Sequence, residues 1–227
     1  MADLVIAYGV AAVAEAAPRV TIDRARAAPL RLCDGPYPFA EAPDLFRLAT
    51  VAQQRDFLRE HLQSLCNLWD KPARLFLDAY FRRIAAAIEE GQGDLAALAE
   101  RAGGLFSPGD WSFCALRPLP QAHLLGVRTD FALWTGAALV AIELVGSATP
   151  RRRRREELAR LRQAEIIVLE LPVERLERAE ERFLAEILPP AFHRFWAGVA
   201  LPSSPFAPQT LGEIRGAGAD QSSASIT

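Results

Sequence analysis

The chain has 227 residues, which is the length of one domain with short additions. Apolar residues make up 51% and charged residues 24%, so the chain can bury a sizeable core and is not disordered overall. The net charge of −2 excludes a general electrostatic attraction for nucleic acid, so any such site has to be a local patch.

The first residues and the cysteines favour a cytoplasmic protein without a membrane anchor. The apolar run at 4–14 has no basic residues before it, and it is shorter than the roughly 20 residues that span a bilayer. Cys33, Cys66 and Cys114 are scattered and form no CxxC pair, which argues against a zinc ribbon or a disulfide framework. A reducing compartment fits this pattern.

The first half of the chain divides into an arm and a helical region. Residues 1–45 are rich in Ala and Pro, and their pattern assigns no element. Residues 46–92 are predicted to be helical, with one apolar stripe that runs through Leu58 and Leu62 to Trp69 and a second helix that starts at Pro72. Asp94 is predicted to cap a short third helix.

Residues 93–200 are predicted to form the core, and residues 201–227 a disordered tail rich in Pro, Ser, Gly and Ala. Strands are expected at 111–116, 127–133, 138–145 and 166–171, the last two apolar on both faces. Helices are expected at 150–163 and 176–187. The predicted class is α/β (α+β), with a mixed central sheet of about four strands in αβββαβ order, flanked by helices.

Asp130 and Glu143 are the residues that suggest chemistry. Each is a carboxylate inside an otherwise apolar strand, where an unpaired charge costs several kcal/mol. A hairpin that turns near Thr135-Gly136 places the two side by side. A divalent cation such as Mg²⁺ or Mn²⁺ would relieve their repulsion, and it could polarise a phosphate and generate hydroxide.

The segments RTDFAL, which contains Asp130, and VAIELVGS, which contains Glu143, resemble the core of the restriction-endonuclease-like, PD-(D/E)xK, superfamily. The closest likeness is to the branch that includes very-short-patch repair endonucleases, and it covers about residues 93–188. The resemblance implies metal-dependent phosphodiester cleavage, with Asp130 and Glu143 as catalytic residues and metal ligands.

The chain departs from this family pattern at Val145, where a lysine or another polar residue is expected. Valine can neither position a water molecule nor stabilise a transition-state charge. Lys71 is the only lysine in the chain, so no nearby lysine replaces it. An arginine of the following helix or Gln163 is a conceivable substitute.

Structural roles remain open for both carboxylates. Asp130 could bond to Arg128 or cap a turn, and Glu143 could pair with an arginine of the neighbouring helix. The strand face could also be exposed, in which case neither charge needs a partner.

A run of five arginines forms a second candidate site, for the phosphates of nucleic acid. Seven arginines against two glutamates in 151–162 make this helix start basic, where the helix dipole disfavours cations. The alternative is that arginines pair with Glu156 and Glu157 one turn on and are otherwise solvated. The run consists of Arg151, Arg152, Arg153, Arg154 and Arg155.

Two functions follow from these sites. The first is a nuclease-fold protein that cleaves DNA or RNA through Asp130, Glu143 and Mg²⁺ or Mn²⁺. The alternative is an inactive protein of the same fold that binds nucleic acid or a protein partner, with a homo-oligomer not excluded. An unrelated scaffold that binds a protein through the arm is a third possibility. The four tryptophans are expected in the core or an interface, with Trp134 the candidate exception as a base-stacking platform.

Overall fold

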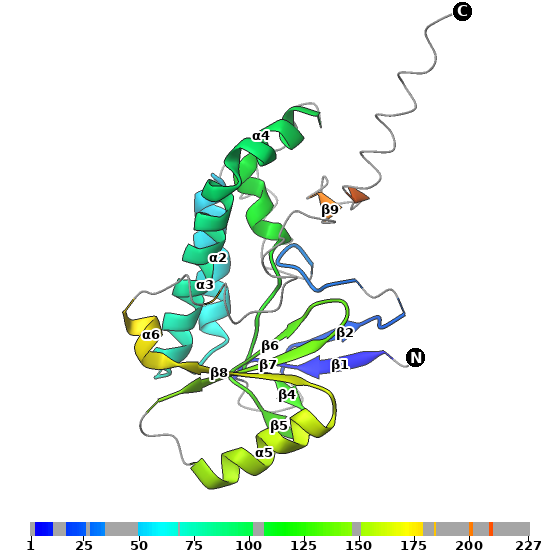
Figure 1. The fold of residues 1–227 in the computed structure, drawn as a ribbon, viewed down its shortest axis with the longest axis vertical. Helices are drawn as coiled ribbons and strands as arrows, with labels where there is room; N and C mark the ends of the chain where they lie inside the picture. The colour runs from blue at the N-terminus through cyan, green and yellow to red at the C-terminus, as the bar shows by residue number, and fades with distance from the viewer. Residues whose placement is uncertain are drawn as a thin grey trace, which may run out of the picture.

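The computed structural model describes residues 3–10, 17–25, 28–34, 50–67, 69–101, 107–146, 151–178, 184, 200–201 and 209–210. Helices pack on a central sheet, and a second sheet lies beside it (Figure 1). The predicted α+β class is confirmed. None of the helices in these ranges combines the length and the apolar composition that crossing a bilayer requires.

The central sheet has the strand order β3-β6-β7-β8. Strands β3 (Leu119–Pro120), β6 (Phe131–Trp134) and β7 (Leu139–Val145) pair antiparallel in succession. Strand β8 (Ile167–Pro172) runs parallel to β7, and helix α5 (Arg151–Gln163) makes the crossover between them. The β6–β7 turn needs Gly136, whose φ of 89° lies in the left-handed region.

Three of the four strands of the second sheet lie in residues to which the sequence pattern assigned no element. Its order is β2-β1-β4-β5. Strands β1 (Leu4–Ala7) and β2 (Arg19–Ile22) pair antiparallel, and Ala7 of β1 also pairs with β4 (His123–Leu124). Strand β5 (Val127–Arg128) completes the sheet. The start of the chain is therefore attached to the segment that immediately precedes β6.

Three helices form one helical layer, in which the second helix packs on the first and on the third. Helix α2 (Val51–Ser64) starts at a capping box in which Thr50 N donates to Gln53 Oε1 (2.8 Å). Asp70 caps α3 (Lys71–Glu90) by accepting from Ala73 N (3.0 Å). Helix α4 (Gln92–Arg101) follows at once, so Asp94 lies in its first turn and does not cap it.

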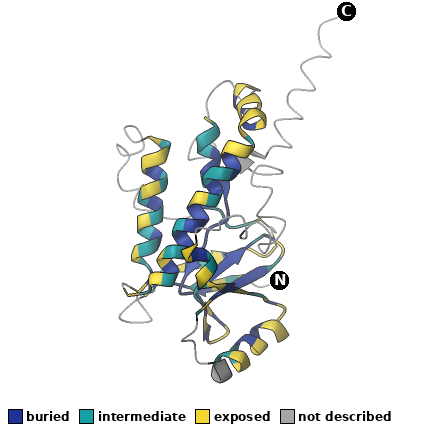
Figure 2. Cartoon of the chain, turned by 60° about the vertical axis from the view of Figure 1, so that its left-hand side comes forward, coloured by how far each residue is buried: buried dark blue, intermediate teal, exposed yellow. Residues whose placement is uncertain are grey.

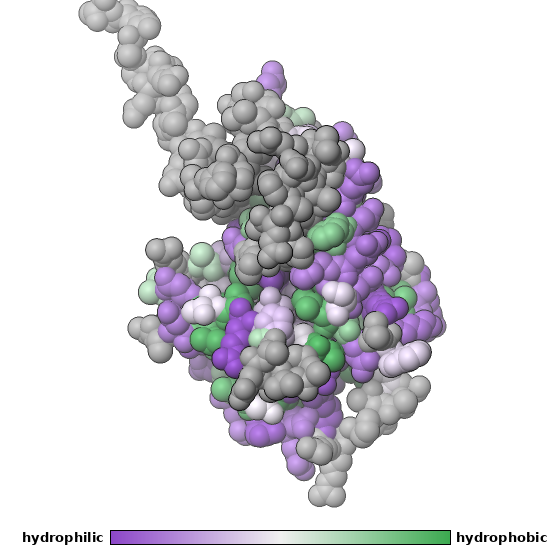
Figure 3. All heavy atoms as spheres, turned by 180° about the vertical axis from the view of Figure 1, so that it is seen from behind, coloured by the Kyte–Doolittle hydropathy of each residue, from purple (hydrophilic) through white to green (hydrophobic). Residues whose placement is uncertain are grey.

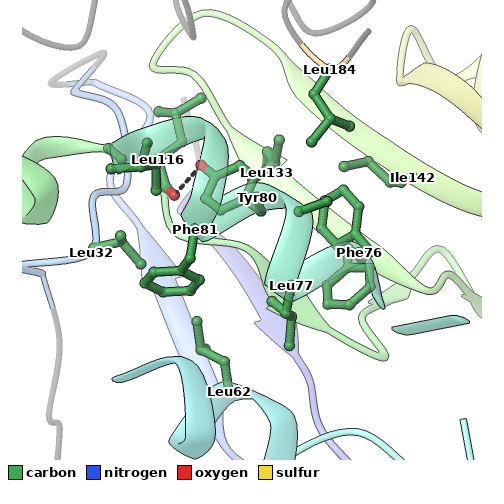
Figure 4. Packing of buried hydrophobic residues seen from close by; sticks show 14 of the residues in the cluster. Leu32, Leu62, Phe76, Leu77, Tyr80, Phe81, Leu116, Leu133, Ile142 and Leu184 are labelled. Carbon is green, nitrogen blue, oxygen red and sulfur yellow. Dashed lines mark hydrogen bonds between the residues drawn. The ribbon is translucent and has the colours of Figure 1, made fainter. Parts of the chain in front are cut away.

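The main core lies between α3 and the central sheet. Phe76, Leu77 and Tyr80 of α3 point toward the sheet, as Figure 4 shows. The rings of Phe76 and Phe131 lie 4.5 Å apart between centroids. The Tyr80 hydroxyl donates to the Leu116 carbonyl (2.6 Å), so the helix layer is joined to the chain just before β3.

Strands β6 and β7 are buried on both faces, and their residues alternate between two cores. Phe131 and Ile142 face the α3 side, whereas Ala132 and Ala141 belong to a second core with Leu158 and Leu161 of α5 and with β1. Figure 2 shows the strands as largely buried and α5 as largely exposed. Alternation therefore places Asp130 and Glu143 on the α5 side of the sheet.

Three predicted strands differ from the structure. Residues 111–116 are not a strand, because the 3₁₀ helix η3 (Pro108–Cys114) starts at Ser107, whose N–H donates to Asp110 Oδ2 (2.6 Å). The predicted strand 127–133 is divided into β5 and β6, which belong to different sheets. Strand β8 lies at the edge of its sheet, with Ile167 exposed and Val168 and Leu169 half-buried, so its apolar side chains are not fully buried on both faces.

The C-terminal part is described only in short pieces. Helix α6 (Val173–Glu177) covers the start of the predicted helix 176–187, most of which lies outside the described residues. Strands β9 (Ala200–Leu201) and β10 (Gln209–Thr210) pair antiparallel, and the rest of the predicted tail also lies outside. From behind, the surface shows hydrophobic atoms in small areas between hydrophilic ones (Figure 3). Within the described ranges, the exposed large apolar side chains are Val5, Val10, Trp69, Leu125, Val145 and Ile167.

Candidate functional site

Asp130 stands where the chain passes from one sheet to the other. Strand β5 ends at Arg128 and β6 begins at Phe131, so Thr129 and Asp130 form a corner between them. Two backbone bonds hold this corner against the β3–β4 turn. Thr129 N donates to Ala122 O (2.8 Å), and Gln121 N donates to Asp130 O (2.7 Å).

The hairpin register places Asp130 opposite Glu143. Phe131 pairs with Ile142 and Ala132 with Ala141, so the next position outward joins Asp130 to Glu143. This is the juxtaposition that the Thr135-Gly136 turn predicts. Both residues lie on the face covered by α5, because each is two positions along its strand from a residue of the second core, Ala132 or Ala141.

The carboxylate of Asp130 is half-buried and fixed by the backbone of the next strand. Its Oδ2 accepts from Leu144 N (2.7 Å). Burial raises the pKa of Asp130, although the Leu144 hydrogen bond opposes this shift. The charge of Asp70 raises the pKa further, whereas Arg154 and Arg128 lower it. A cation beside Asp130 would therefore favour its charged form.

Glu143 is 5% exposed, and its two oxygens have different surroundings. Oε2 is in an ion pair with Arg154, whose Nε donates to it (2.9 Å) and whose second guanidinium nitrogen also contacts it. Oε1 is buried, and no described residue donates a hydrogen bond to it. Burial raises the pKa of Glu143 to about 7, against the hydrogen bond from Arg154, and the charge of Asp130 adds to the increase.

Arg154 is the residue by which α5 contacts the candidate site, through its ion pair with Glu143. It also donates to Glu157 Oε2 (2.9 Å) within its own helix. Burial alone would lower the pKa of Arg154, but the hydrogen bonds and charges of Glu143 and Glu157 outweigh burial and raise it. Glu143 is therefore the member of the pair that titrates, and Arg154 stays charged.

The described members of the arginine run differ in their surroundings. Arg154 faces inward and pairs with Glu143, so it belongs to the carboxylate site. The reason is helical periodicity, because Arg154 lies one turn before the buried Leu158. Arg155 is exposed. The side chains of Arg151, Arg152 and Arg153 lie outside the described residues.

Val145 occupies the position where the family pattern has a lysine, and Lys71 is the only lysine of the chain. Val145 is the last residue of β7 and is 36% exposed, at the end of the strand that carries Glu143. Lys71 lies at the start of α3, and its Nζ donates to Glu177 Oε1 (3.0 Å). Among the conceivable substitutes, Arg154 is the cation that contacts Glu143.

A chain of polar contacts behind Asp130 escaped the sequence analysis. The buried Gln121 donates through Nε2 to Asp70 Oδ2 (3.3 Å), and its Oε1 accepts from Arg128. The β3–β4 turn gives Gln121 a φ of 50°, which is uncommon for a residue other than glycine. The preceding Pro-Leu-Pro was the available signal for a turn here, but it does not indicate what the glutamine contacts.

At this site, the described residues provide two carboxylates as possible ligands for a cation, those of Asp130 and Glu143. Across the described ranges, three or more His, Cys, Asp or Glu side chains do not gather closely enough to hold a metal ion. Comparison with protein-family models, with curated proteins and with solved structures gave no match. The argument for function therefore starts from the geometry of Asp130 and Glu143.

Proposed function

We propose that this chain is a nuclease-fold protein that hydrolyses phosphodiester bonds of DNA or RNA with a divalent cation held by Asp130 and Glu143. The observation that carries the proposal is the pairing of two carboxylates at the end of the β6–β7 hairpin, where Glu143 Oε1 is buried without a hydrogen-bond donor among the described residues. An unsatisfied buried polar atom costs about 1–3 kcal/mol, and a cation would remove that cost.

The donor set suits Mg²⁺ or Mn²⁺. Mg²⁺ is commonly bound by one or two carboxylates, with water and substrate phosphates as its other ligands. Such a cation polarises the phosphate and lowers the pKa of a bound water molecule. Asp130 is held in place by the Leu144 N–H, and Arg154 keeps a positive charge beside Glu143. That guanidinium could donate to a phosphate oxygen of the substrate.

A second candidate function is nucleic-acid or protein binding without catalysis. Two observations favour it. Val145 occupies the position of the motif lysine, and Glu143 Oε2 is already paired with Arg154. On strand β8, Glu170 likewise accepts from Arg162 of α5 (2.6 Å), so arginines of α5 neutralise acids on two neighbouring strands.

We also propose that the protein works in the cytoplasm. Cys33, Cys66 and Cys114 are all free thiols. Burial raises the pKa of Cys66 to about 12, which makes its thiol unreactive. Free, unreactive thiols support a reducing compartment.

The test of the enzymatic proposal is an Mn²⁺ titration by calorimetry, with a nicking assay on supercoiled plasmid and on structured RNA. Wild type should bind Mn²⁺ and nick, and Glu143→Gln and Asp130→Asn should each reduce nicking at least 100-fold. Glu170→Gln is the matched control, because it also removes a carboxylate paired with an α5 arginine, and it should nick like wild type.

Two results would decide against hydrolysis at this site. Nicking that survives Asp130→Asn would place the active centre elsewhere. An absence of both metal binding and nicking in wild type would leave the binding function as the better account.

A further inference from the structure

Trp69 is 90% exposed, so it does not lie in the core, which is one of the two places expected for it. Helix α2 ends at Ser64, so Trp69 does not continue the apolar stripe of that helix. The loop around it is nevertheless held by its own hydrogen bonds. Trp69 N donates to Asn67 Oδ1 (3.2 Å), and Lys71 N donates to Trp69 O (3.0 Å). The backbone therefore presents the indole ring to solvent.

The loop of Trp69 is tied to the candidate site by two hydrogen bonds. Asp70, the next residue, accepts from Gln121 Nε2 (3.3 Å), and Gln121 N donates to Asp130 O (2.7 Å). A strand of nucleic acid whose phosphate reaches Asp130 would therefore pass close to Trp69.

Exposed basic side chains surround the same loop. Arg74 lies one turn into α3, and Arg128 ends β5 directly before the Asp130 corner. Lys71 is also exposed, although it contacts Glu177. An aromatic ring beside separated cations is the combination that binds single-stranded nucleic acid, where bases stack on the ring and cations follow the phosphates.

We propose that Trp69 is a stacking platform for an unpaired base, so that the site takes single-stranded nucleic acid. This inference rests on the proposed function and names its substrate class. In a duplex both faces of a base are covered by its neighbours, whereas a single strand leaves a face free for the indole. Stacking of one base predicts a loss of about tenfold in affinity when the ring is removed.

The test is fluorescence anisotropy with a short fluorescein-labelled oligothymidylate and with a duplex of the same length, in Ca²⁺ and again in EDTA. We expect wild type to bind the single strand more tightly than the duplex, and Trp69→Ala to bind it about tenfold more weakly. Trp69→Phe keeps a ring and should retain most of the affinity. Ile167→Ala, which shortens another exposed apolar side chain, is the matched control and should leave affinity unchanged.

Intrinsic fluorescence supplies a readout specific to the ring. The oligothymidylate should quench the indole emission of a Trp196→Phe background, and the quenching should be lost when Trp69→Phe is added, since Trp111 and Trp134 are buried. Trp196 is replaced because it lies outside the described residues. Three results would overturn the inference. Trp69→Ala could keep the wild-type affinity for oligothymidylate, Ile167→Ala could lose as much affinity as Trp69→Ala, or wild type could fail to bind the single strand. Loss of binding in Trp69→Ala together with nicking that survives Asp130→Asn would uphold the stacking site and reject the proposed active centre.

Discussion

Glu143 has one oxygen in an ion pair and one buried oxygen without a hydrogen-bond donor among the described residues. Both a structural and a catalytic role account for the first oxygen, whereas a proton, a water molecule or a cation would satisfy the second. The surroundings of Glu143 also explain its raised pKa of about 7, because burial outweighs the hydrogen bond and the charge of Arg154 at Oε2. Near neutral pH, a proton and a metal ion would compete for this carboxylate.

The raised pKa of Glu143 predicts that it reduces stability as pH rises. From its ordinary pKa of 4.5 up to about 7, the folded chain holds a proton that the unfolded chain has released, so the free energy of unfolding falls with pH. Over that range the loss attributable to Glu143 amounts to about 3 kcal/mol. Glu143→Gln lacks this titration, so urea unfolding at pH 5 and pH 8 should show a smaller fall for the variant. Equal falls in both proteins would contradict the pKa assignment.

At the scale of elements, the β6–β7 hairpin was predictable and its surroundings were not. Alternating apolar residues and the Thr135-Gly136 turn determine the register, and the register brings Asp130 and Glu143 together. The division of 127–133 could not be predicted, because it depends on which sheet each half joins. Gln121 was missed for a related reason: its surroundings come from contacts between segments far apart in the chain. Trp69 was misplaced because α2 ends at Ser64, before the apolar stripe reaches it.

The ion pair between Arg154 of α5 and Glu143 of β7 predicts that removing the arginine alone costs more stability than removing both charges. Arg154→Ala leaves the buried Glu143 without its cation, so it should destabilise the fold by about 2–4 kcal/mol at pH 8, where that carboxyl is charged. Adding Glu143→Gln should recover much of this loss, because the buried charge is then gone. Urea unfolding of the four proteins measures the coupling. Strictly additive effects would show that the ion pair is energetically unimportant.

On the scale of the whole molecule, two cores share the β6 and β7 strands. One joins them to α3, and the other joins them to α5 and β1. Leu65, at the end of α2, packs against both cores. The sequence predicted the α3 core well, because helical spacing identifies its inward side chains. It did not predict that β1 belongs to the second core, because a four-residue strand gives too little pattern to assign.

The hydrogen bond from the Tyr80 hydroxyl to the Leu116 carbonyl helps to hold the helix layer to the rest of the fold. Tyr80→Phe keeps the ring but leaves the buried Leu116 carbonyl without this donor, so it should destabilise by about 1–3 kcal/mol. Chemical unfolding would give that difference, and the nicking and oligonucleotide-binding assays should be unaffected when run on folded protein. A neutral substitution would mean that another group, such as water, satisfies the carbonyl.

The pairing of Ala7 with His123 has a consequence for how the chain is made. During synthesis, strand β1 leaves the ribosome long before β4 exists to receive it, and the strand stays exposed while the helices emerge. The corner at Asp130 follows β4 and β5 directly, so it takes its final form only after this late closure. Tags or deletions at the start of the chain are therefore expected to disturb a site that lies in the second half of the sequence.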